Sequence, residues 1–273
     1  MSESDWVTGK VGLRIGNVPL DLEMTVPARP IRPHRMLPIF HQMADSFADI
    51  GVQIDAEAGR SVSCQAGCTA CCYQAVPVSE IEIYYIAELV SALPEPRRSE
   101  IRRRFAESLK HFRDIGWFDD LHSRKAGSLK GAEALVLKYY HERIPCPFLE
   151  DSMCSIYEQR PVGCREFLVT SPAENCSNPT AESVRAVGLP VKPSSAIKAM
   201  AARDAVKREG FLLLTMALEI AEKYPEDFPE KTGEQWMADF FGRLTDEPAP
   251  YTDQRTTPVK SVANRRKRPR AKR

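Results

Sequence analysis

The chain has 273 residues, of which 43% are apolar, so it is long enough and apolar enough to bury a sizeable core. Its longest apolar stretch, at 211–218, is far shorter than the roughly 18 residues of a membrane span, and we expect no transmembrane helix. The polar, acidic N-terminus does not resemble a secretory signal. We therefore expect a cytoplasmic protein, and in that compartment clustered cysteines favour metal binding over disulfides.

The formal net charge of +1 hides an uneven distribution. Seven of the nine residues from Arg265 to Arg273 are basic, which leaves 31 basic against 37 acidic groups in the rest of the chain. We expect a disordered basic tail at 246–273, because this segment is rich in proline, threonine and charge. Nucleic acid or an acidic surface would be contacted only through this tail. A flexible, solubilising tail is favoured, because no aromatic residues interleave with the charges.

Alternating apolar residues predict a β-hairpin near the N-terminus. The alternation covers 11–15 and resumes over 18–26, around a turn at Gly16-Asn17. Apolar residues at helical spacing then predict a helix over Ile39–Ile50 that ends at Gly51.

The remaining helices are predicted from caps and periodicity. Ser79 and Glu82 form a capping box that begins a helix ending near Leu93. Helices are also expected over 101–112, with a solvated arginine-rich face, and over 131–143. Residues 144–190 show little periodicity and should be loop organised by metal ligation. Beyond them, Ser194 is expected to cap a long helix through Ala221 that is interrupted by Gly210, and a short helix should cover 234–244.

These elements predict a mainly α-helical protein with an irregular, cysteine-rich, metal-organised centre, flanking helices and a small N-terminal β-hairpin. We expect four regions along the chain. They are the hairpin and helix at 1–60, a cysteine-cluster metal-binding domain at 61–191, a helical region at 192–245 and the disordered tail at 246–273.

Four of the eight cysteines fall within nine residues, in the segment CQAGCTACC, at Cys64, Cys68, Cys71 and Cys72. Gaps of two and three residues let a tight loop converge its sulfurs on one ion, with Gly67 supplying backbone freedom. Cysteines that serve only as small buried apolar residues have no reason to crowd in this way. The cluster therefore predicts a metal site.

A second set lies in CPFLEDSMCSIYEQRPVGCREF and in the later Asn175-Cys176, at Cys146, Cys154, Cys164 and Cys176. Together the two blocks resemble the YkgJ-type, or CxxCxxCC, cysteine-cluster family, a zinc- or iron-chelating domain. The resemblance covers residues 64–190, including VRAVGLP at its end, although three residues rather than two separate Cys64 from Cys68. It implies zinc or iron chelation and an iron-sulfur cluster, without a general substrate. Flagellin lysine methylases resemble the same domain.

Eight thiolates suffice for two four-ligand sites or for one site with spare cysteines. The adjacent side chains of Cys71 and Cys72 diverge in extended backbone, so they would serve two ions, two irons of one cluster, or a ligand and a buried neighbour. We favour ligands drawn from both blocks. Four thiolates suit zinc and iron-sulfur clusters alike, but a dense triplet followed by a distant cysteine favours the cluster.

Two arginines, Arg160 and Arg165, flank Cys164 and are candidate cofactor-binding residues, because guanidinium groups would offset the negative charge of a thiolate-ligated centre. The alternative is that each pairs with a nearby carboxylate such as Glu158 or Glu166. Phe148, Leu149, Ile156 and Tyr157 are expected to cover the sulfurs as an apolar lid, or simply to pack in the core. Of the five histidines, only His141 is near enough in sequence to join the site.

The sequence therefore predicts a metal-binding protein, most simply one that chelates an iron-sulfur cluster or iron for redox or protein-modification chemistry. Such a protein would be an oxidoreductase or a protein N-methylase-like enzyme, working with a protein or redox partner. The alternative is a zinc-binding structural or interaction module without catalytic activity. A metal with an open coordination position and an adjoining pocket would favour the enzyme. A metal fully coordinated by four cysteines would favour the zinc-binding module. No phosphate-binding loop or nucleophile elbow supports other chemistry.

Overall fold

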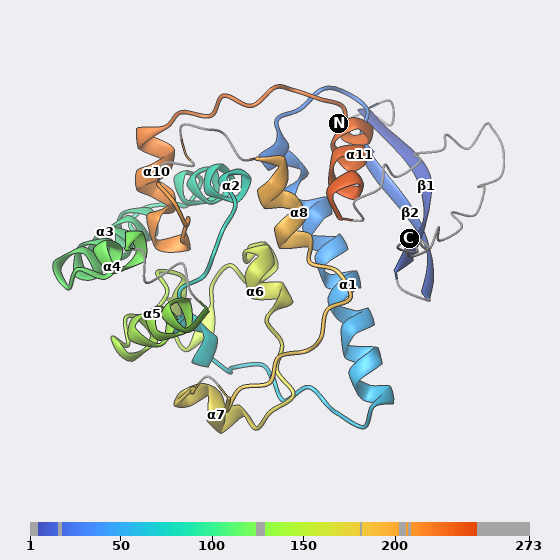
Figure 1. The fold of residues 1–273 in the computed structure, drawn as a ribbon. Coiled ribbons are helices and arrows are strands. Elements are labelled where there is room, and N and C mark those ends of the chain that lie inside the picture. Colours follow the sequence, from blue (N-terminus) through green and yellow to red (C-terminus); the bar gives the residue numbers. More distant parts are fainter. Residues whose placement is uncertain are drawn as a thin grey trace, which may run out of the picture.

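The computed structural model describes residues 5–15, 18–123, 129–180, 182–201, 206 and 209–244. This part of the chain is mainly α-helical with a small N-terminal antiparallel hairpin, which confirms the predicted fold class (Figure 1). The predicted Gly16-Asn17 turn and the basic tail at 246–273 lie outside the described residues. Within them, no helix combines the length and the apolar character needed to cross a membrane.

Two long strands form the hairpin and two very short strands form a second ribbon: β1 (Trp6–Ile15) with β2 (Val18–Pro27), and β3 (Leu149–Glu150) with β4 (Met153–Cys154). The α-helices are α1 (Leu37–Glu57), α2 (Glu80–Ser91), α3 (Arg97–Asp114), α4 (Trp117–His122), α5 (Leu129–His141), α6 (Val162–Glu166), α7 (Ala173–Ser177), α8 (Pro193–Met200), α10 (Ala217–Lys223) and α11 (Gly233–Leu244). Short 3-10 helices are η2 (Pro33–Met36), η3 (Ala70–Tyr73), η5 (Tyr157–Gln159) and η6 (Leu214–Met216).

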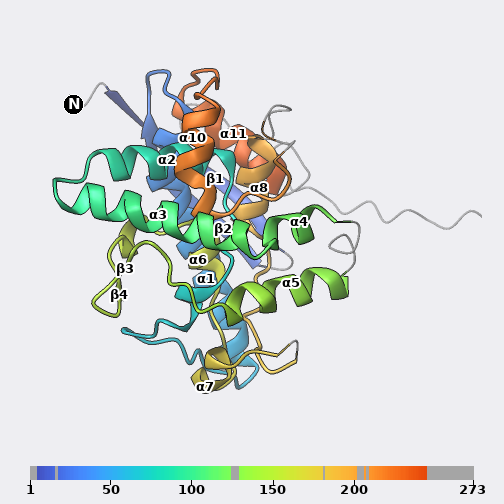
Figure 2. The same ribbon diagram turned by 90° about the vertical axis from the view of Figure 1, so that its left-hand side faces the viewer.

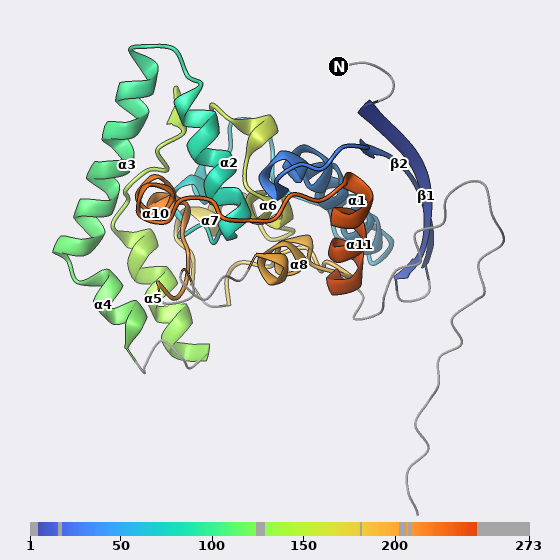
Figure 3. The ribbon, with the colours of Figure 1, turned by 90° about the horizontal axis from the view of Figure 1, so that it is seen from above.

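The first hydrophobic cluster joins the hairpin to α1, α8 and α11. Alternation along the hairpin turns Val11 and Val26 inward, where both are buried. Phe40 on α1 stacks on Phe240 on α11 with ring centroids 5.0 Å apart. Seen from above, the hairpin lies along the side of the molecule next to α1 and α11 (Figure 3). The N-terminal and C-terminal helical segments therefore share one core.

The second hydrophobic cluster joins α2, α3, α4, α5 and α10. At its centre, the ring of Phe112 stacks on that of Tyr139 at 3.8 Å, and the Trp117 ring packs edgewise against both. Figure 2 shows α3 and α4 running across this face with α5 beneath them. The capping box of α2 is present as predicted: Glu82 N–H donates to Ser79 Oγ, and Ser79 N–H donates to the Glu82 carboxylate.

The short helix α6 is fixed between these two clusters, near the middle of the molecule (Figure 1). Val162 at its start is buried in the first cluster. The Val162 N–H donates to Glu82 at 2.8 Å, so one buried carboxylate both caps α2 and holds α6. Burial raises the pKa of Glu82, because the charged carboxylate is disfavoured away from water. Cys164 lies two residues further along α6.

Two helix boundaries predicted from sequence are wrong. Helix α1 continues through Gly51 to Glu57. Gly51 does not end the helix but lets another segment of the chain pack closely against it. A Cβ atom there would lie 3.0 Å from Val187 and Leu189 side-chain atoms, so the missing side chain lets segment 187–189 pack against the helix.

The helix predicted to run from Ser194 to the interruption at Gly210 is too long. Helix α8 ends at Met200, and Gly210 adopts a left-handed φ of 73°, so the chain turns before α10 begins. Ser194 does not cap α8. Its N–H and hydroxyl instead donate to the Glu166 carboxylate at 2.7 and 2.6 Å, which ties α8 to the end of α6.

Candidate metal centre

The first cysteine block is a tight loop followed by one turn of 3-10 helix. Gly67 has a φ of 82°, and the Cys68 N–H closes a turn onto the Gln65 carbonyl at 3.0 Å. The next turn, η3, carries Cys71 and Cys72, and the Cys72 N–H donates to the Thr69 carbonyl. The chain thus reverses direction twice within nine residues and holds its four thiols close together.

The second block presents each cysteine from a different short element. Cys146 follows α5, Cys154 ends β4, Cys164 lies in α6 and Cys176 lies in α7. The turn between β3 and β4 uses left-handed φ values at Asp151 and Ser152. This compact ribbon returns Cys154 to the neighbourhood of Cys146.

Backbone hydrogen bonds join the two blocks. The Cys146 N–H donates to the Cys72 carbonyl at 2.7 Å, and the Ser63 N–H donates to the Val169 carbonyl at 2.9 Å. The Val169 N–H in turn donates to Cys64 Sγ at 3.4 Å. Helix α7 contacts η3, which brings Cys176 to the same place. Two stretches about a hundred residues apart in sequence therefore meet in one region.

All eight cysteines are free thiols. Cys71 lies at their centre, because its thiol shares a hydrogen bond with Cys72 and interacts electrostatically with five other thiols. These five are Cys64, Cys146, Cys154, Cys164 and Cys176. The side chain of Cys71 is exposed and that of Cys176 is buried, whereas the rest are half-buried. The thiols are thus neighbours as well as members of two sequence motifs.

The thiols differ in acidity. The hydrogen bond from Cys72 lowers the pKa of Cys71 to about 7, and the nearby Arg160 charge acts in the same direction. The same hydrogen bond, together with burial, raises the pKa of Cys72. Burial raises the pKa of Cys146 to about 12 and raises that of Cys164 well above its ordinary value. Cys71 is therefore the thiol most ready to ionise near neutral pH.

The two arginines next to Cys164 have different surroundings. Arg160 lies near enough to lower the pKa of Cys64 and Cys154, and its guanidinium covers the Tyr157 ring at 4.0 Å. Its Nε is buried and has no hydrogen-bond partner within the described residues. Arg165 is 5% exposed and pairs with Asp45 on α1 at 2.5 Å. It also donates to the Arg160 and Glu158 carbonyls, so its charge is already compensated.

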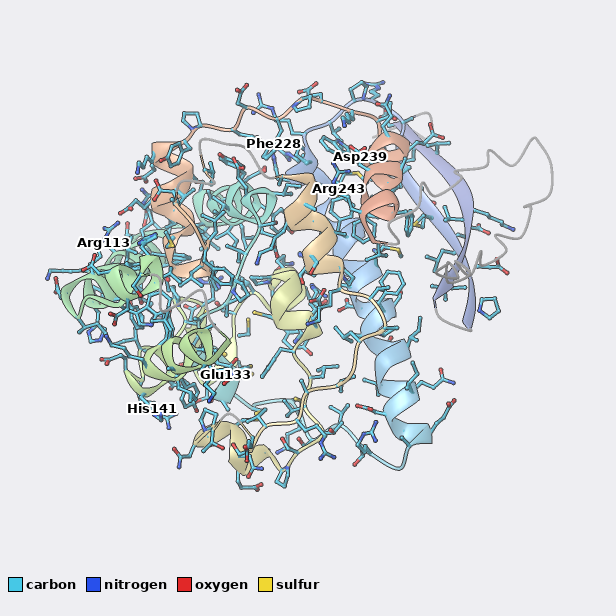
Figure 4. The ribbon with its side chains drawn as sticks, viewed as in Figure 1. Arg113, Glu133, His141, Phe228, Asp239 and Arg243 are labelled. Carbon is cyan, nitrogen blue, oxygen red and sulfur yellow. The ribbon has the colours of Figure 1, made fainter. Side chains whose placement is uncertain are left out.

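The expected lid is divided between core and surface. Phe148 and Ile156 are buried in the second hydrophobic cluster, with Cys146 and Cys154 packed against it. Tyr157 is 57% exposed and contacts Arg160 instead. His141 lies at the end of α5 on the exposed surface, where Figure 4 labels it together with Glu133 of the same helix.

Sequence reasoning missed one pair of residues that support the site. The Tyr140 hydroxyl, fully buried, donates to the Cys176 carbonyl at 2.6 Å. Arg143 in turn donates to the Tyr140 hydroxyl and to the Ser177 carbonyl. Only the fold shows that the Tyr140 hydroxyl reaches a cysteine 36 positions away.

Two cavities adjoin the cysteine region and share Tyr140 as a wall. The first, of about 420 Å³, lies beside the Cys68 loop and is largely polar, with Arg143 and Glu174 among its lining groups. The second, of about 360 Å³, lies between α5 and segment 167–186 and is mostly apolar, with Val136 and Phe167 in its walls. A small molecule or side chain therefore has room next to the thiols.

Within the described part of the chain, no group of three or more His, Cys, Asp or Glu side chains is arranged so that it could hold a metal ion as it stands. The donor set nevertheless suits zinc or iron, because thiolates are the ligands these metals take in four-cysteine sites. The unpartnered Arg160 Nε beside the thiols fits a centre of negative charge.

Comparison with known proteins gives one match. Residues 63–181 match the model of the CxxCxxCC family, described as "Putative zinc- or iron-chelating domain". No curated protein and no solved structure matches the chain. The matched segment begins one residue before Cys64 and contains all eight cysteines. Residues 63–181 of this chain are thus similar to the CxxCxxCC zinc- or iron-chelating domain, as the cysteine motifs indicated.

Proposed function

We propose that the cysteines of both blocks ligate an iron-sulfur centre, and that the protein uses it in redox or protein-modification chemistry. The observation that carries the proposal is the meeting of eight free thiols around Cys71. Cysteines are the usual protein ligands of iron-sulfur clusters, which supply one-electron transfer or radical chemistry.

Charge near the thiols supports a cluster. A four-iron cluster with four thiolates is negative, and reduction adds a further electron. Arg160 places a positive charge beside three of the cysteines and has a free N–H, within the described residues, that could donate toward sulfur. Hydrogen bonds and charge near the sulfurs are the main means by which proteins set a cluster's potential.

The polar cavity beside Cys68 supports chemistry rather than a purely structural role. Its volume of about 420 Å³ could hold a small polar reactant or an extended side chain next to the cluster. Arg143 and Glu174 line this space, so it could recognise both acidic and basic groups. A cytoplasmic location, where thiols remain reduced, is part of the same proposal.

The test is metal and sulfide analysis of the full chain purified without oxygen. We expect iron with acid-labile sulfide, a brown colour and broad visible absorption that fades in air. Stoichiometric zinc without sulfide would contradict the cluster and leave the zinc-binding interaction module, whose thiolates would form closed coordination spheres.

Arginine variants provide a second, independent test. Arg160→Gln should lower the reduction potential, because it removes a positive charge that stabilises the more negative, reduced cluster. The iron content should stay nearly intact. Arg165→Gln is the matched control, since Asp45 already compensates the Arg165 charge and the shift should be smaller. Equal shifts in both variants would count against a specific role for Arg160.

A further inference from the structure

The interactions among the thiols place seven of the eight cysteines in two groups, while Cys71 interacts with members of both. The Cys64 thiol interacts with those of Cys68 and Cys71. The Cys176 thiol interacts with all three of these thiols. Helix α7 and η3 are in contact, and Cys64 is held by the Val169 N–H on the strand-like segment that leads to α7. These contacts identify one neighbourhood around the CQAGC loop.

The other neighbourhood surrounds the β3–β4 ribbon. The Cys146 N–H bonds to the Cys72 carbonyl, and Leu149, which starts the ribbon, bonds back to the Cys146 carbonyl and pairs with Cys154. The Cys72 thiol interacts with those of Cys146 and Cys154. Cys164 on α6 interacts with Cys146 and Cys154, and also with Cys71.

Cys71 and Cys72 are the point where the two neighbourhoods touch. Their thiols share a hydrogen bond, so the two sets are adjacent, yet neighbouring residues in a chain direct their side chains differently. Cys72 is tied by its own carbonyl to Cys146. Cys71 also interacts with Cys146, Cys154 and Cys164. Because those three already form a set of four with Cys72, Cys71 is the thiol left to complete the neighbourhood of Cys64, Cys68 and Cys176.

We infer that this chain builds two four-cysteine metal centres, one from Cys64, Cys68, Cys71 and Cys176 and the other from Cys72, Cys146, Cys154 and Cys164. The inference rests on the proposed function, because it divides among two centres the thiols that are proposed to bind metal. Four thiolates complete either an iron-sulfur cluster or a zinc site. In two-cluster ferredoxins, too, one cysteine of a closely spaced run ligates a different cluster from the rest of the run.

Among the residues that line the polar cavity, the one cysteine is Cys68, which belongs to the first centre. The first centre is therefore the one that a small reactant would meet. The second centre packs against the hydrophobic cluster through Cys146 and Cys154. The two centres thus have unequal access to solvent.

Paired cysteine-to-serine variants test the division. The full chain would be reconstituted anaerobically with iron and sulfide, and bound iron and sulfide would be measured per chain. We expect Cys68→Ser and Cys154→Ser each to lower the iron content about twofold. The double variant within one set, Cys68→Ser with Cys176→Ser, should match the single variant. The double variant across sets, Cys68→Ser with Cys154→Ser, should hold almost no iron.

Other results overturn the inference. If the within-set double variant loses all iron, or a single variant loses all, the thiols form one centre. If the single variants keep the full amount, the ligands are assigned wrongly. Wild-type protein that binds no metal would instead refute the proposed function itself.

Because cysteine variants could misfold, a second measurement uses the wild-type protein. In wild-type protein treated with increasing chelator, alkylation followed by peptide mass spectrometry should expose the cysteines in two groups of four, with Cys71 in the first set and Cys72 in the second. Tyr140→Phe should promote release of the first group alone, because it removes the hydrogen bond to the Cys176 carbonyl. Simultaneous exposure of all eight would contradict the division.

Discussion

The two hydrophobic clusters and the cysteine-rich centre are built on different principles. The clusters consist of helices whose aromatic rings interlock, such as Phe40 with Phe240 and Phe112 with Tyr139. In the centre, α6 and α7 have five residues each, too short to be stable by themselves, and single hydrogen bonds link the segments. Burial can stabilise the first kind of region, whereas the second is expected to depend on metal ligation.

Metal removal should show this difference most strongly. Structural zinc contributes about 10–16 kcal/mol to the folding of small domains, which is more than the whole stability of many proteins. We expect a chelator to increase amide hydrogen exchange over 61–76 and 144–190 by orders of magnitude, while the helices of the two hydrophobic clusters, α1, α2 and α3 among them, change little. Hydrogen exchange with mass spectrometry measures both regions at once. A uniform change, or none, would mean that the centre does not depend on a metal.

A core substitution should have the opposite signature. Phe240→Ala removes a fully buried ring from the first cluster and should lower the free energy of unfolding by about 3–5 kcal/mol, with the metal content unchanged. Phe211→Ala, at a ring that is 46% exposed, is the control and should cost far less. Denaturant unfolding and metal analysis would be combined. Metal loss in the folded Phe240→Ala protein would show that the two regions are coupled.

The buried His41 predicts acid sensitivity in the first cluster. Burial, aided by the Arg165 and Arg160 charges, lowers the pKa of His41 to about 3, below the ordinary 6.5. Between these values the unfolded chain binds a proton that the folded chain does not, so stability falls as pH drops below 6.5. The loss should reach about 3 kcal/mol at pH 4.5.

Replacement by a group that does not titrate isolates this effect. His41→Gln should lose less stability than the wild type between pH 7 and pH 4.5, as measured by urea unfolding at each pH. Because acid also protonates metal-binding thiolates, only the difference between the two proteins bears on His41. Parallel pH profiles would rule out the histidine as the cause.

The smallest effect is expected on the arginine-rich face of α3. Arg103 pairs with Glu100 and Glu107 in full contact with solvent, and such pairs contribute little to stability. Arg103→Ala should leave the melting temperature and the metal content almost unchanged. A clear drop in either would reveal a role for this face that its exposure does not suggest.

Local signals in the sequence were enough for much of the fold. Strict alternation predicted the hairpin, and the Ser79 and Glu82 pair predicted the start of α2. The predicted helix end at Gly51 was wrong. From the sequence alone, a glycine that ends a helix cannot be told from one that lets a neighbouring segment pack closely. The interruption at Gly210 was predicted, and its left-handed backbone agrees, but the earlier end of α8 at Met200 was not.

For the site, the sequence identified the cysteines but not their supports. Crowding of Cys71 and Cys72 marks a functional loop without any knowledge of the fold. The Tyr140 hydrogen bond and the Arg165 pair with Asp45 connect residues 36 and 120 positions apart, so no local pattern could reveal them. Which cysteines are neighbours is likewise a property of the folded chain.

X-ray absorption at the edge of the bound metal tests the central claim most directly, because it reports the ligand atoms whatever the metal is. For anaerobically purified full-length protein, we predict a first shell of about four sulfur atoms per metal, near the 2.3 Å typical of metal–thiolate bonds. An iron-sulfur cluster would add a metal–metal distance beyond that shell. A first shell made only of nitrogen and oxygen would contradict the account, because the cysteines would then not be the ligands.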